Sequence, residues 1–416
     1  MKANFVIPSW SYWKEPLRAQ PLTQLYLATI LEEEGHRVVI TDFREKDVRV
    51  ENADAFFYTV ASPDFKEVTG LVKKLKDTFG GKHIAGGPHP SIFPKETKKV
   101  FDAVAVGRGE ESIKLIAEDV EHDSLHHFYY LPAEGYYPFP KRHFLPERKI
   151  VNDSLFKTDE VKSTTAQFSF GCPYGCSFCA NYTQGKTKRN RLEKISAEIE
   201  YLKEKYGIEG LSLQDEIAIP ENEEEALKYL GMMKSKGIKW RGQNRAKINR
   251  RILRRAKESG LVELSIGLES VNQEVLDKTH KGIRVKDAEN TLFACKDYGI
   301  KTRIYLLNGL PGEPGYIVKE TKDFIERTTP DLVLLSSLQP YPGSPLADNP
   351  EKYGMTILDK DFSKYNHLRG RFKDSKDNIE GAVPYEYKKG KGLPRQQIMD
   401  NLVNLQSFLR DKGLNK

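Results

Sequence analysis

The stretch FSFGCPYGCSFCANYTQG, residues 168–185, gathers three of the four cysteines of the chain into the pattern C-x-x-x-C-x-x-C. Cys172, Cys176 and Cys179 form this pattern, whereas Cys295 lies far away in the sequence. A structural zinc site is closed by four protein ligands, and no pair of Cys or His stands at the spacing needed to complete one here. A cubic iron–sulfur cluster held by three thiolates leaves one iron open to a ligand from outside the protein. The pattern therefore indicates a metal centre with one open position.

The segments around this stretch alternate between strand and helix patterns from residue 163 onward. We predict strands over residues 165–171, 210–216, 239–244, 262–270, 301–309 and 332–341. Each of the first five is followed by a helical stretch. Six such units, spaced about 25 to 45 residues apart, indicate an open six-stranded parallel α/β barrel, because a closed eight-unit barrel would need more chain. The cysteines follow the first strand, at the end of such a barrel where active sites are built.

The first 120 residues alternate in shorter units. We predict strands over residues 4–8, 37–43, 53–62, 82–87 and 103–107, and helices over 22–36, 65–80, 94–101 and 110–120. This alternation is typical of a doubly wound parallel sheet, in which ligands bind at the carboxyl edge of the strands. That edge is predicted to carry TVASPD (59–64), AGGPHPS (85–91) and VGRGEES (106–112).

The fold class is therefore α/β, with an N-terminal doubly wound (Rossmann-like) parallel sheet, a partial (β/α)6 barrel and a small C-terminal extension. The predicted domains are residues 1–120, a Pro-rich and aromatic linker over 121–162, the barrel over 163–345 and the extension over 346–416. The extension contains the basic segments 369–377 and 385–397 and ends in an amphipathic helix pattern over 395–413. A solvated loop is the plainer interpretation of the basic segments, and a surface that binds a partner is the alternative.

Composition sets further limits on the function. The net charge of +7 is modest for 416 residues, and the basic residues are interleaved with nearly as many acids, so nucleic acid is not indicated as a partner. We expect no membrane span, because no run of about 18 apolar residues occurs. The first ten residues contain an apolar run too short for the core of a signal peptide, and we expect a cytoplasmic protein.

The cysteine pattern after the first strand of a six-unit barrel resembles the signature of the radical S-adenosylmethionine superfamily. Phe178 matches the aromatic residue that usually precedes the last cysteine of that signature. The resemblance continues at the later strand ends, in SLQDE (212–216), WRGQNR (240–245), the SIGLES segment from Ser265, and YLLNGLPGE (305–313). It implies that S-adenosylmethionine is bound by Phe178, Gln214, Asp215, Glu216, Arg245, Ser265, Glu269 and Gly309, and that a 4Fe-4S cluster is bound by Cys172, Cys176 and Cys179.

The first domain resembles the cobalamin-binding domain that precedes the barrel in one branch of this superfamily. The resemblance implies a cobalamin site made by Thr59, Ser62, Gly86, Gly87, Pro88, Gly107, Gly109 and Glu110. Glycines suit such a site because a side chain would collide with a large flat ligand. The D-x-H-x-x-G motif that places a His below cobalt in other cobalamin proteins is absent from the sequence, and Arg108 stands where the branch commonly has an acid.

The resemblance implies a C-methyltransferase that uses S-adenosylmethionine, the cluster and methylcobalamin. A 5′-deoxyadenosyl radical would take hydrogen from an unactivated sp3 carbon, which would then accept the methyl group. A low-potential donor such as ferredoxin or flavodoxin would supply electrons. We expect the methyl acceptor to be a polypeptide, and a glutamine of methyl-coenzyme M reductase is the specific candidate.

Two alternatives remain open. One is a radical cyclisation or rearrangement without methyl transfer. The other, from a different class, is a zinc or nucleic-acid binding protein that uses the cysteine loop and the basic C-terminal segments. Cys295 is predicted to be an ordinary buried thiol in the helix before the fifth barrel strand, rather than a fourth ligand.

Overall fold

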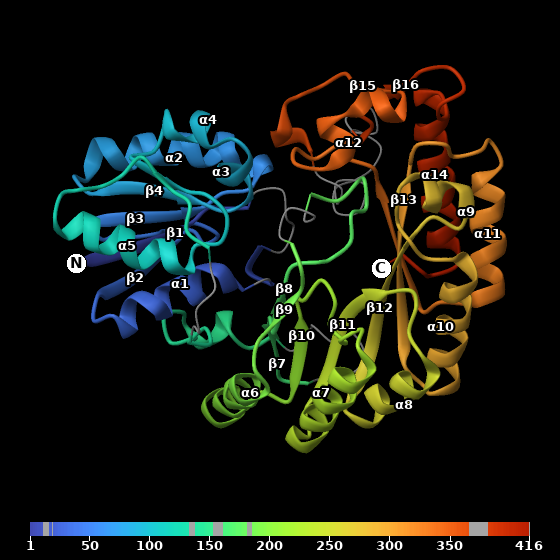
Figure 1. The fold of residues 1–416 in the computed structure, drawn as a ribbon, viewed down its shortest axis with the longest axis horizontal. Coiled ribbons are helices and arrows are strands. Elements are labelled where there is room, and N and C mark those ends of the chain that lie inside the picture. Colours follow the sequence, from blue (N-terminus) through green and yellow to red (C-terminus); the bar gives the residue numbers. More distant parts are fainter. Residues whose placement is uncertain are drawn as a thin grey trace. The chain divides into compact units, whose positions relative to one another are not determined.

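A computed structural model describes residues 1–10, 16–18, 20–132, 138–152, 161–180, 185–365 and 382–415 of the chain. The chain divides into two compact units, Met1–Asn152 and Asp153–Lys416. Each unit is built on its own six-stranded sheet (Figure 1). Within the parts of the chain that the structure describes, no helix has the length and apolar character needed to cross a bilayer.

The first unit is a parallel sheet covered by helices on both faces, which confirms the predicted doubly wound fold. Its strands are β1 (Lys2–Ile7), β2 (Arg37–Asp42), β3 (Ala55–Thr59), β4 (Lys82–Gly86), β5 (Ala103–Ala105) and β6 (Phe128–Tyr129), in the order β2-β1-β3-β4-β5-β6. Its helices are α1 (Leu22–Glu33), α2 (Phe65–Thr78), α3 (Pro88–Ile92), α4 (Pro94–Lys98) and α5 (Glu110–Glu121). Helices α1 and α5 lie side by side on one face, and α2, α3 and α4 cover the other (Figure 1).

The sixth strand of this sheet was not predicted. β6 has two residues and lies within the segment predicted as a linker, parts of which, 133–137 and 153–160, are outside the described residues. A strand of two residues carries no periodic pattern, so only its pairing with β5, through Val104 and Phe128, identifies it. Among the described residues of this unit, three short 3-10 helices also occur, η1 (Pro16–Arg18), η2 (Ser62–Asp64) and η3 (Glu147–Lys149).

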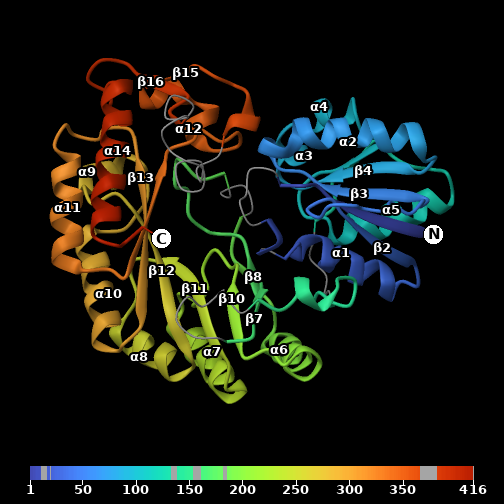
Figure 2. The same cartoon turned by 180° about the vertical axis from the view of Figure 1, so that it is seen from behind.

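The second unit is an open barrel, as predicted. Its strands are β7 (Ser163–Ala166), β10 (Gly210–Leu213), β11 (Lys239–Arg245), β12 (Leu261–Glu269), β13 (Lys301–Asn308) and β14 (Leu332–Ser337). They form one parallel sheet in the order β14-β13-β12-β11-β10-β7, which curls into a half-barrel with β7 and β14 as its edge strands (Figure 1). The helices along its outer face are α6 (Leu192–Tyr206), α7 (Glu223–Lys236), α8 (Arg250–Glu258), α10 (Val285–Asp297) and α11 (Ile317–Thr328), and Figure 2 shows them from behind.

The two faces of the barrel sheet differ because side chains alternate along a strand. In β12, Leu264, Ile266 and Leu268 are fully buried, whereas Glu263 and Ser265 belong to the opposite, polar set. The apolar set packs against the helices. The polar set faces the barrel interior, where a charged ligand would find partners.

The first barrel strand is shorter than predicted. The prediction gave one strand over 165–171, but β7 ends at Ala166, and β8 (Ser169–Phe170) forms a separate antiparallel hairpin with β9 (Lys188–Arg189). The buried carboxylate of Asp215 accepts hydrogen bonds from the Phe168 amide, at 3.1 Å, and from the Ser169 hydroxyl. These bonds draw the chain out of the barrel sheet just before the cysteines.

The C-terminal extension packs against the end of β13. It contributes α12 (Pro345–Asp348), the 3-10 helices η5 (Pro350–Tyr353) and η6 (Phe362–Lys364), the antiparallel pair β15 (Met355–Ile357) and β16 (Tyr385–Tyr387), and α14 (Arg395–Asp411). One apolar cluster joins Val383, Tyr385 and Ile398 of the extension to Leu310 and to α9 (Gln273–Lys278) of the barrel. The basic segment 369–377 lies outside the described residues.

Candidate functional site

The three clustered cysteines lie in the loop that connects β8 to β9. Cys176 is buried, Cys172 and Cys179 are half-buried, and all three are free thiols. The Cys179 amide donates to the Cys176 carbonyl at 3.1 Å, which closes a tight turn between the last two cysteines. Gly171 enters the loop with φ of 83°, a left-handed conformation that favours glycine.

The loop is held from two sides through the backbone of Ser177, which is fully buried. Its amide donates to the Thr279 carbonyl at 2.9 Å, just after α9, and its carbonyl accepts from the Leu346 amide of α12 at 2.8 Å. The ring of Phe178 packs against the apolar cluster that joins the extension to the barrel. The fourth barrel unit and the C-terminal extension therefore both fix the residues between Cys176 and Cys179.

Burial raises the pKa of the Cys172 thiol, and the neighbouring Cys176 and Glu216 act in the same direction. A hydrogen bond from the backbone amide of Tyr174 and the charge of Arg245 oppose this rise by favouring the thiolate. A bound iron would supply the larger positive charge that keeps such thiols deprotonated.

The cysteine loop offers three free thiols, the number that a cubic cluster with one open iron needs. Among the residues that the structure describes, no three His, Cys, Asp or Glu side chains converge closely enough to hold one metal ion. A cubic cluster binds each cysteine at a separate iron and so needs a wider spacing than one tetrahedral ion does. The residues that would hold it are Cys172, Cys176 and Cys179.

Arg245 lies at the end of β11, almost fully buried. Its Cζ atom is 3.2 Å from the ring centroid of Tyr174, so the guanidinium stacks on a residue placed between Cys172 and Cys176. Its Nη2 donates to the Lys281 carbonyl. The Tyr174 hydroxyl in turn donates to the carboxylate of Glu221, beyond the end of β10. The cysteine loop is thus joined to the end of β11 and to the segments that follow β10 and β12.

Glu269 ends β12 in a strained conformation. Its φ is 69°, which is unusual for a residue other than glycine, and the strand register shifts between Gly267 and Glu269. Its carboxylate forms an ion pair of 3.0 Å with the Nζ of Lys281. That Nζ also lies 5.8 Å from the ring centroid of Phe178. Strain held at the mouth of a barrel is typical of a binding site.

The other residues predicted to bind S-adenosylmethionine occupy two different environments. Ser265 is buried on β12, in register with Gln243 of β11, and Gln214 is exposed at the end of β10. Asp215 is fully buried among Phe168, Ser169 and Arg189, and burial raises its pKa although these neighbours oppose the rise. Asp215 therefore anchors the hairpin that carries the cysteines, and direct contact with the ligand stays a prediction for all of these residues.

Gly309 is surrounded by the C-terminal extension. Its amide donates to both carboxylate oxygens of Glu313 at 3.0 Å, and its carbonyl accepts from the hydroxyls of Tyr385 at 2.9 Å and Tyr387 at 2.8 Å. A Cβ at position 309 would lie 2.2 Å from the Tyr385 hydroxyl. This close approach is a structural reason for glycine here, and its predicted contact with S-adenosylmethionine stays a prediction.

Sequence reasoning missed four residues of this region, namely Tyr174, Glu221, Tyr385 and Tyr387. Tyr174 lies inside the cysteine motif, where an aromatic residue between two candidate ligands is the local signal that points to it. The other three are far from their partners in the sequence. Cys295 is fully buried in α10, and burial raises its pKa to about 12, which confirms the prediction of an ordinary buried thiol.

The residues predicted for cobalamin lie along the carboxyl edge of the first sheet. Thr59 and Gly86 end the paired strands β3 and β4, and the Val60 amide donates to the Gly86 carbonyl at 2.9 Å. Gly87 has φ of 103°, and a Cβ there would lie 3.1 Å from the Val60 amide nitrogen and carbonyl oxygen. Pro88 follows as the first residue of α3.

Two further glycines lie between β5 and α5. Gly107 has φ of 85°, and a Cβ there would have no heavy atom within 4 Å, so a flat ligand could approach its backbone. Its amide donates to the Ser91 hydroxyl at 2.9 Å. Gly109 precedes α5, where the carboxylate of Glu110 is paired with Arg108. Arg108 is thus neutralised within its own loop. The open backbone fits a large planar cofactor such as cobalamin.

His89 is a buried neighbour of this edge that the prediction did not include. Its Nδ1 lies 3.1 Å from the Ser62 hydroxyl, and its ring stacks on Phe65 with centroids 4.0 Å apart. Burial lowers its pKa to about 4, so the imidazole is neutral at physiological pH. His89 therefore orients Ser62, one of the residues predicted to bind cobalamin.

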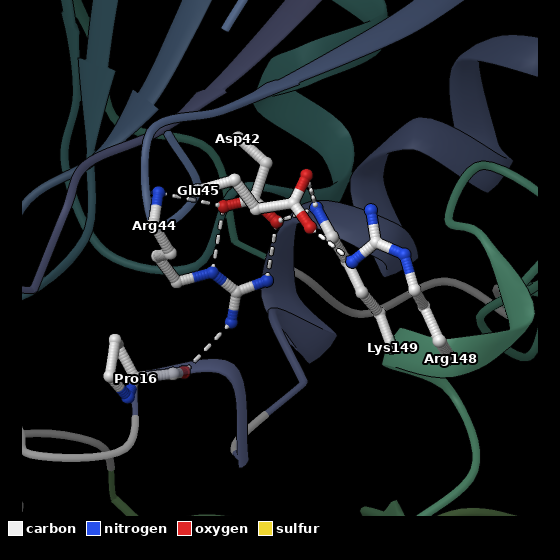
Figure 3. A network of polar contacts seen from close by, with 6 residues as sticks. All are labelled: Pro16, Asp42, Arg44, Glu45, Arg148 and Lys149. Atoms are coloured by element: carbon white, nitrogen blue, oxygen red, sulfur yellow. Dashed lines mark hydrogen bonds and ion pairs between the residues drawn. The ribbon is translucent and has the colours of Figure 1, made fainter. Parts of the chain in front are cut away.

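A buried ion network lies at the end of β2, as Figure 3 shows. Asp42 pairs with Arg44 at 2.7 Å and with Lys149 at 2.7 Å, and Lys149 also reaches Glu45 at 3.1 Å. Burial raises the pKa of Asp42, but the bonds from the two cations outweigh it and hold the pKa below its usual value. The network fastens η3 to the carboxyl edge of the sheet, and Arg44 also donates to the Pro16 carbonyl at 3.2 Å.

Two family models match this chain, one in each unit. The model of the radical SAM superfamily matches residues 167–325, and the model of the B12 binding domain matches residues 16–117. The three cysteines fall inside the first range, and the glycine-rich edge falls inside the second.

Curated relatives match across both units. An uncharacterized methyltransferase of Pyrococcus horikoshii is 25% identical over 357 residues, covering 78% of this chain and 77% of that protein. The anaerobic magnesium-protoporphyrin IX monomethyl ester cyclase of Cereibacter sphaeroides is 25% identical over 273 residues, covering 62% of this chain but 41% of that protein. The bacteriochlorophyllide d C-12(1)-methyltransferase of Chlorobaculum tepidum is 25% identical over 335 residues, covering 78% of this chain and 67% of that protein.

A solved structure shares the fold of the whole chain. The radical S-adenosylmethionine methyltransferase TsrM from Kitasatospora setae, with cobalamin and a [4Fe-4S] cluster bound, superposes with a TM-score of 0.72. The match covers 97% of this chain and 90% of that one at 15% identity, so it shows a common fold.

Proposed function

We propose that this chain, which belongs to the cobalamin-dependent radical S-adenosylmethionine methyltransferases, transfers a methyl group to an unactivated sp3 carbon. One observation carries the proposal: a three-cysteine loop at the mouth of an open barrel stands in the same chain as a B12-binding unit with a glycine-lined edge. When bound, the cluster supplies the electron that cleaves S-adenosylmethionine, and methylcobalamin supplies the methyl group.

The residues of this chain would bind and orient these groups. Cys172, Cys176 and Cys179 would hold the cluster, and its open position would be left to S-adenosylmethionine. The guanidinium of Arg245 provides a fixed positive charge beside the cysteine loop, suited to a carboxylate. The pair of Glu269 and Lys281 provides the acceptor and donor groups that a ribose needs.

Individual residue roles and domain limits are part of the proposal. The matched ranges 16–117 and 167–325 lie inside the predicted domains 1–120 and 163–345. The open backbone at Gly107 supports its assignment to cobalamin, as does the hydroxyl of Ser62 that His89 orients. The remaining assignments rest on the resemblance of the motifs.

We further propose a polypeptide as the methyl acceptor, with a glutamine of methyl-coenzyme M reductase as the first substrate to test. The lysines of 388–391 in the extension support a polypeptide, since they would attract an acidic chain. A ferredoxin or flavodoxin is the proposed electron donor. The proposed location is the cytoplasm, because its reducing conditions keep four free cysteines reduced.

A second candidate, radical cyclisation without methyl transfer, is favoured by one observation. Two curated relatives are named anaerobic magnesium-protoporphyrin IX monomethyl ester cyclases. The chain spans less than half the length of each of them. The methyltransferase match from Chlorobaculum spans two thirds of its relative, so methyl transfer remains the leading proposal.

The test is an anaerobic assay with reductant, S-adenosylmethionine, cobalamin and a glutamine peptide. Methyl transfer predicts 5′-deoxyadenosine, S-adenosylhomocysteine and methylated peptide together. 5′-Deoxyadenosine without S-adenosylhomocysteine would instead support cyclisation or rearrangement. A colourless zinc protein after reconstitution with iron and sulfide would reject both.

A further inference from the structure

Tyr174 makes two contacts that the proposed function does not require. It lies between Cys172 and Cys176, its ring face covers the guanidinium of Arg245, and its hydroxyl donates to the Glu221 carboxylate. The ring is therefore held in two ways, by the guanidinium stacked on its face and by the hydrogen bond from its hydroxyl.

Arg245 is confined from a second direction by the loop after α9. Its Nη2 donates to the Lys281 carbonyl, and a Cβ at Gly282 would lie 3.2 Å from that same nitrogen. Gly282 has φ of 65°, so both its conformation and the close approach favour glycine. With one face and one nitrogen engaged, the plane of the guanidinium has a single orientation.

This arrangement places a positive charge beside the cysteine loop before any ligand arrives. Arg245 acts electrostatically on Cys172, and the side chain is almost fully buried, so solvent screens its charge weakly. A guanidinium that is already oriented loses little conformational entropy when it binds a carboxylate.

We propose that Tyr174 is a positioning residue, which holds Arg245 in the orientation that receives the carboxylate of S-adenosylmethionine. The inference rests on the proposed function in one respect, the binding of S-adenosylmethionine at the mouth of this barrel. It predicts that Tyr174 acts through Arg245 rather than through the cluster itself.

The experiment measures S-adenosylmethionine binding to the anaerobic, cluster-loaded protein by calorimetry and by the change in the electron paramagnetic resonance spectrum of the reduced cluster. We expect Tyr174→Leu to weaken binding about tenfold, because a desolvated cation–π contact is lost. Tyr174→Phe keeps the ring face and should weaken binding about twofold to threefold. Iron content should equal that of the unchanged protein in both variants.

A double-mutant cycle shows whether Tyr174 acts through Arg245. In an Arg245→Met background, Tyr174→Leu should cause no further loss of affinity. Tyr298→Leu is the matched control, since Arg250 stacks on that ring at 5.5 Å on the outer side of the barrel, and it should leave binding unchanged. Additive losses in the cycle, or full affinity in Tyr174→Leu with intact cluster, would overturn the inference.

If Tyr174→Leu loses iron, Tyr174→Phe and Glu221→Ala decide, because each removes the hydrogen bond between the Tyr174 hydroxyl and the Glu221 carboxylate and both must weaken binding equally. Unequal or absent effects reject the inference. If S-adenosylmethionine leaves the spectrum of the unchanged protein unaltered, the proposed function itself is wrong. The two failures are thereby distinguished.

Discussion

Each unit presents the same kind of edge, the carboxyl ends of six parallel strands. The residue types that line the two edges are different. The edge of the first sheet is lined by Gly87, Gly107 and Gly109, and one of them leaves open space where a Cβ would be. The mouth of the barrel is lined by charged and aromatic side chains, among them Arg245 and Glu269. A wide flat cofactor needs access to backbone, whereas a zwitterionic nucleoside needs fixed charges, so similar scaffolds serve different ligands.

The largest effect is expected from loss of a cluster cysteine, which tests whether the cluster site and the cobalamin site are independent. Cys176→Ala should abolish cluster assembly, because two thiolates cannot hold a cubic cluster, and should leave cobalamin binding to the first unit unchanged. Iron and sulfide content, visible absorption and cobalamin retention after anaerobic reconstitution measure this. Cys295→Ala is the control and should keep the cluster. Loss of cobalamin in Cys176→Ala would contradict the independence of the two edges.

Asp42→Asn tests the ion network of the first unit. The change leaves Arg44 and Lys149 buried without their shared carboxylate, and removing one partner of a buried pair costs about 3 to 5 kcal/mol. Hydrogen exchange of the β1 and β2 amides should accelerate accordingly, with the barrel strands unchanged. The exposed Asp47→Asn is the control, and equal exchange in both variants would refute a stabilising network.

The pH dependence of the free energy of unfolding tests the buried carboxyl group of Glu313 in the barrel unit. Burial raises the pKa of Glu313 to about 8, although amide bonds from Gly309 and Leu310 oppose the rise. Between the unfolded value of 4.5 and about 8 the folded state holds a proton that the unfolded state has released, so stability falls as pH rises through this window. Glu313→Gln should remove that slope in unfolding measured from about pH 5 to 9, whereas Glu204→Gln should keep it. A slope that survives Glu313→Gln would assign it to another group.

Alanine substitutions at Gly87 and Gly109 distinguish the effect of backbone strain on stability from the effect of an added side chain on cobalamin binding. Gly87→Ala forces a side chain into a left-handed, crowded position and should destabilise the first unit by about 1 to 3 kcal/mol. Gly109→Ala adds a methyl group in ordinary contact with Leu27, 3.5 Å away, so stability should change by less than about 0.5 kcal/mol while cobalamin affinity falls. Hydrogen exchange and cobalamin titration measure the two quantities, and unchanged affinity in Gly109→Ala would remove this residue from the site.

Tyr387→Phe should give the smallest effect. The Gly309 carbonyl keeps its bond from Tyr385 when the Tyr387 hydroxyl is lost, so the barrel should lose about 1 kcal/mol. The exposed Tyr316→Phe is the control for chemical denaturation. A loss several times larger would show that the two tyrosines act as a single unit.

Local patterns were sufficient for most of the architecture. Alternating residues such as Leu264 and Glu263 identify a strand with one apolar and one polar face, and this period is fixed by the backbone. The cysteine spacing, the order of the units and the glycines of the first edge are equally local. The shortened first strand was not predicted, because the Asp215 carboxylate that draws it away lies 47 residues from Phe168.

The sequence by itself determined two parallel α/β units and the clustering of three cysteines in one loop, and it predicted a cluster with one open iron and a glycine-lined edge for a flat cofactor. Only the tertiary structure decided that Tyr174 stacks on Arg245, that α12 bonds the backbone of Ser177, and that tyrosines of β16 cap Gly309. The physical reason is the separation in sequence between the interacting residues. A strand or a ligand motif is set by spacing within a few residues, whereas these contacts join groups that chain folding brings together across about 70 to 170 positions, and no local period encodes them.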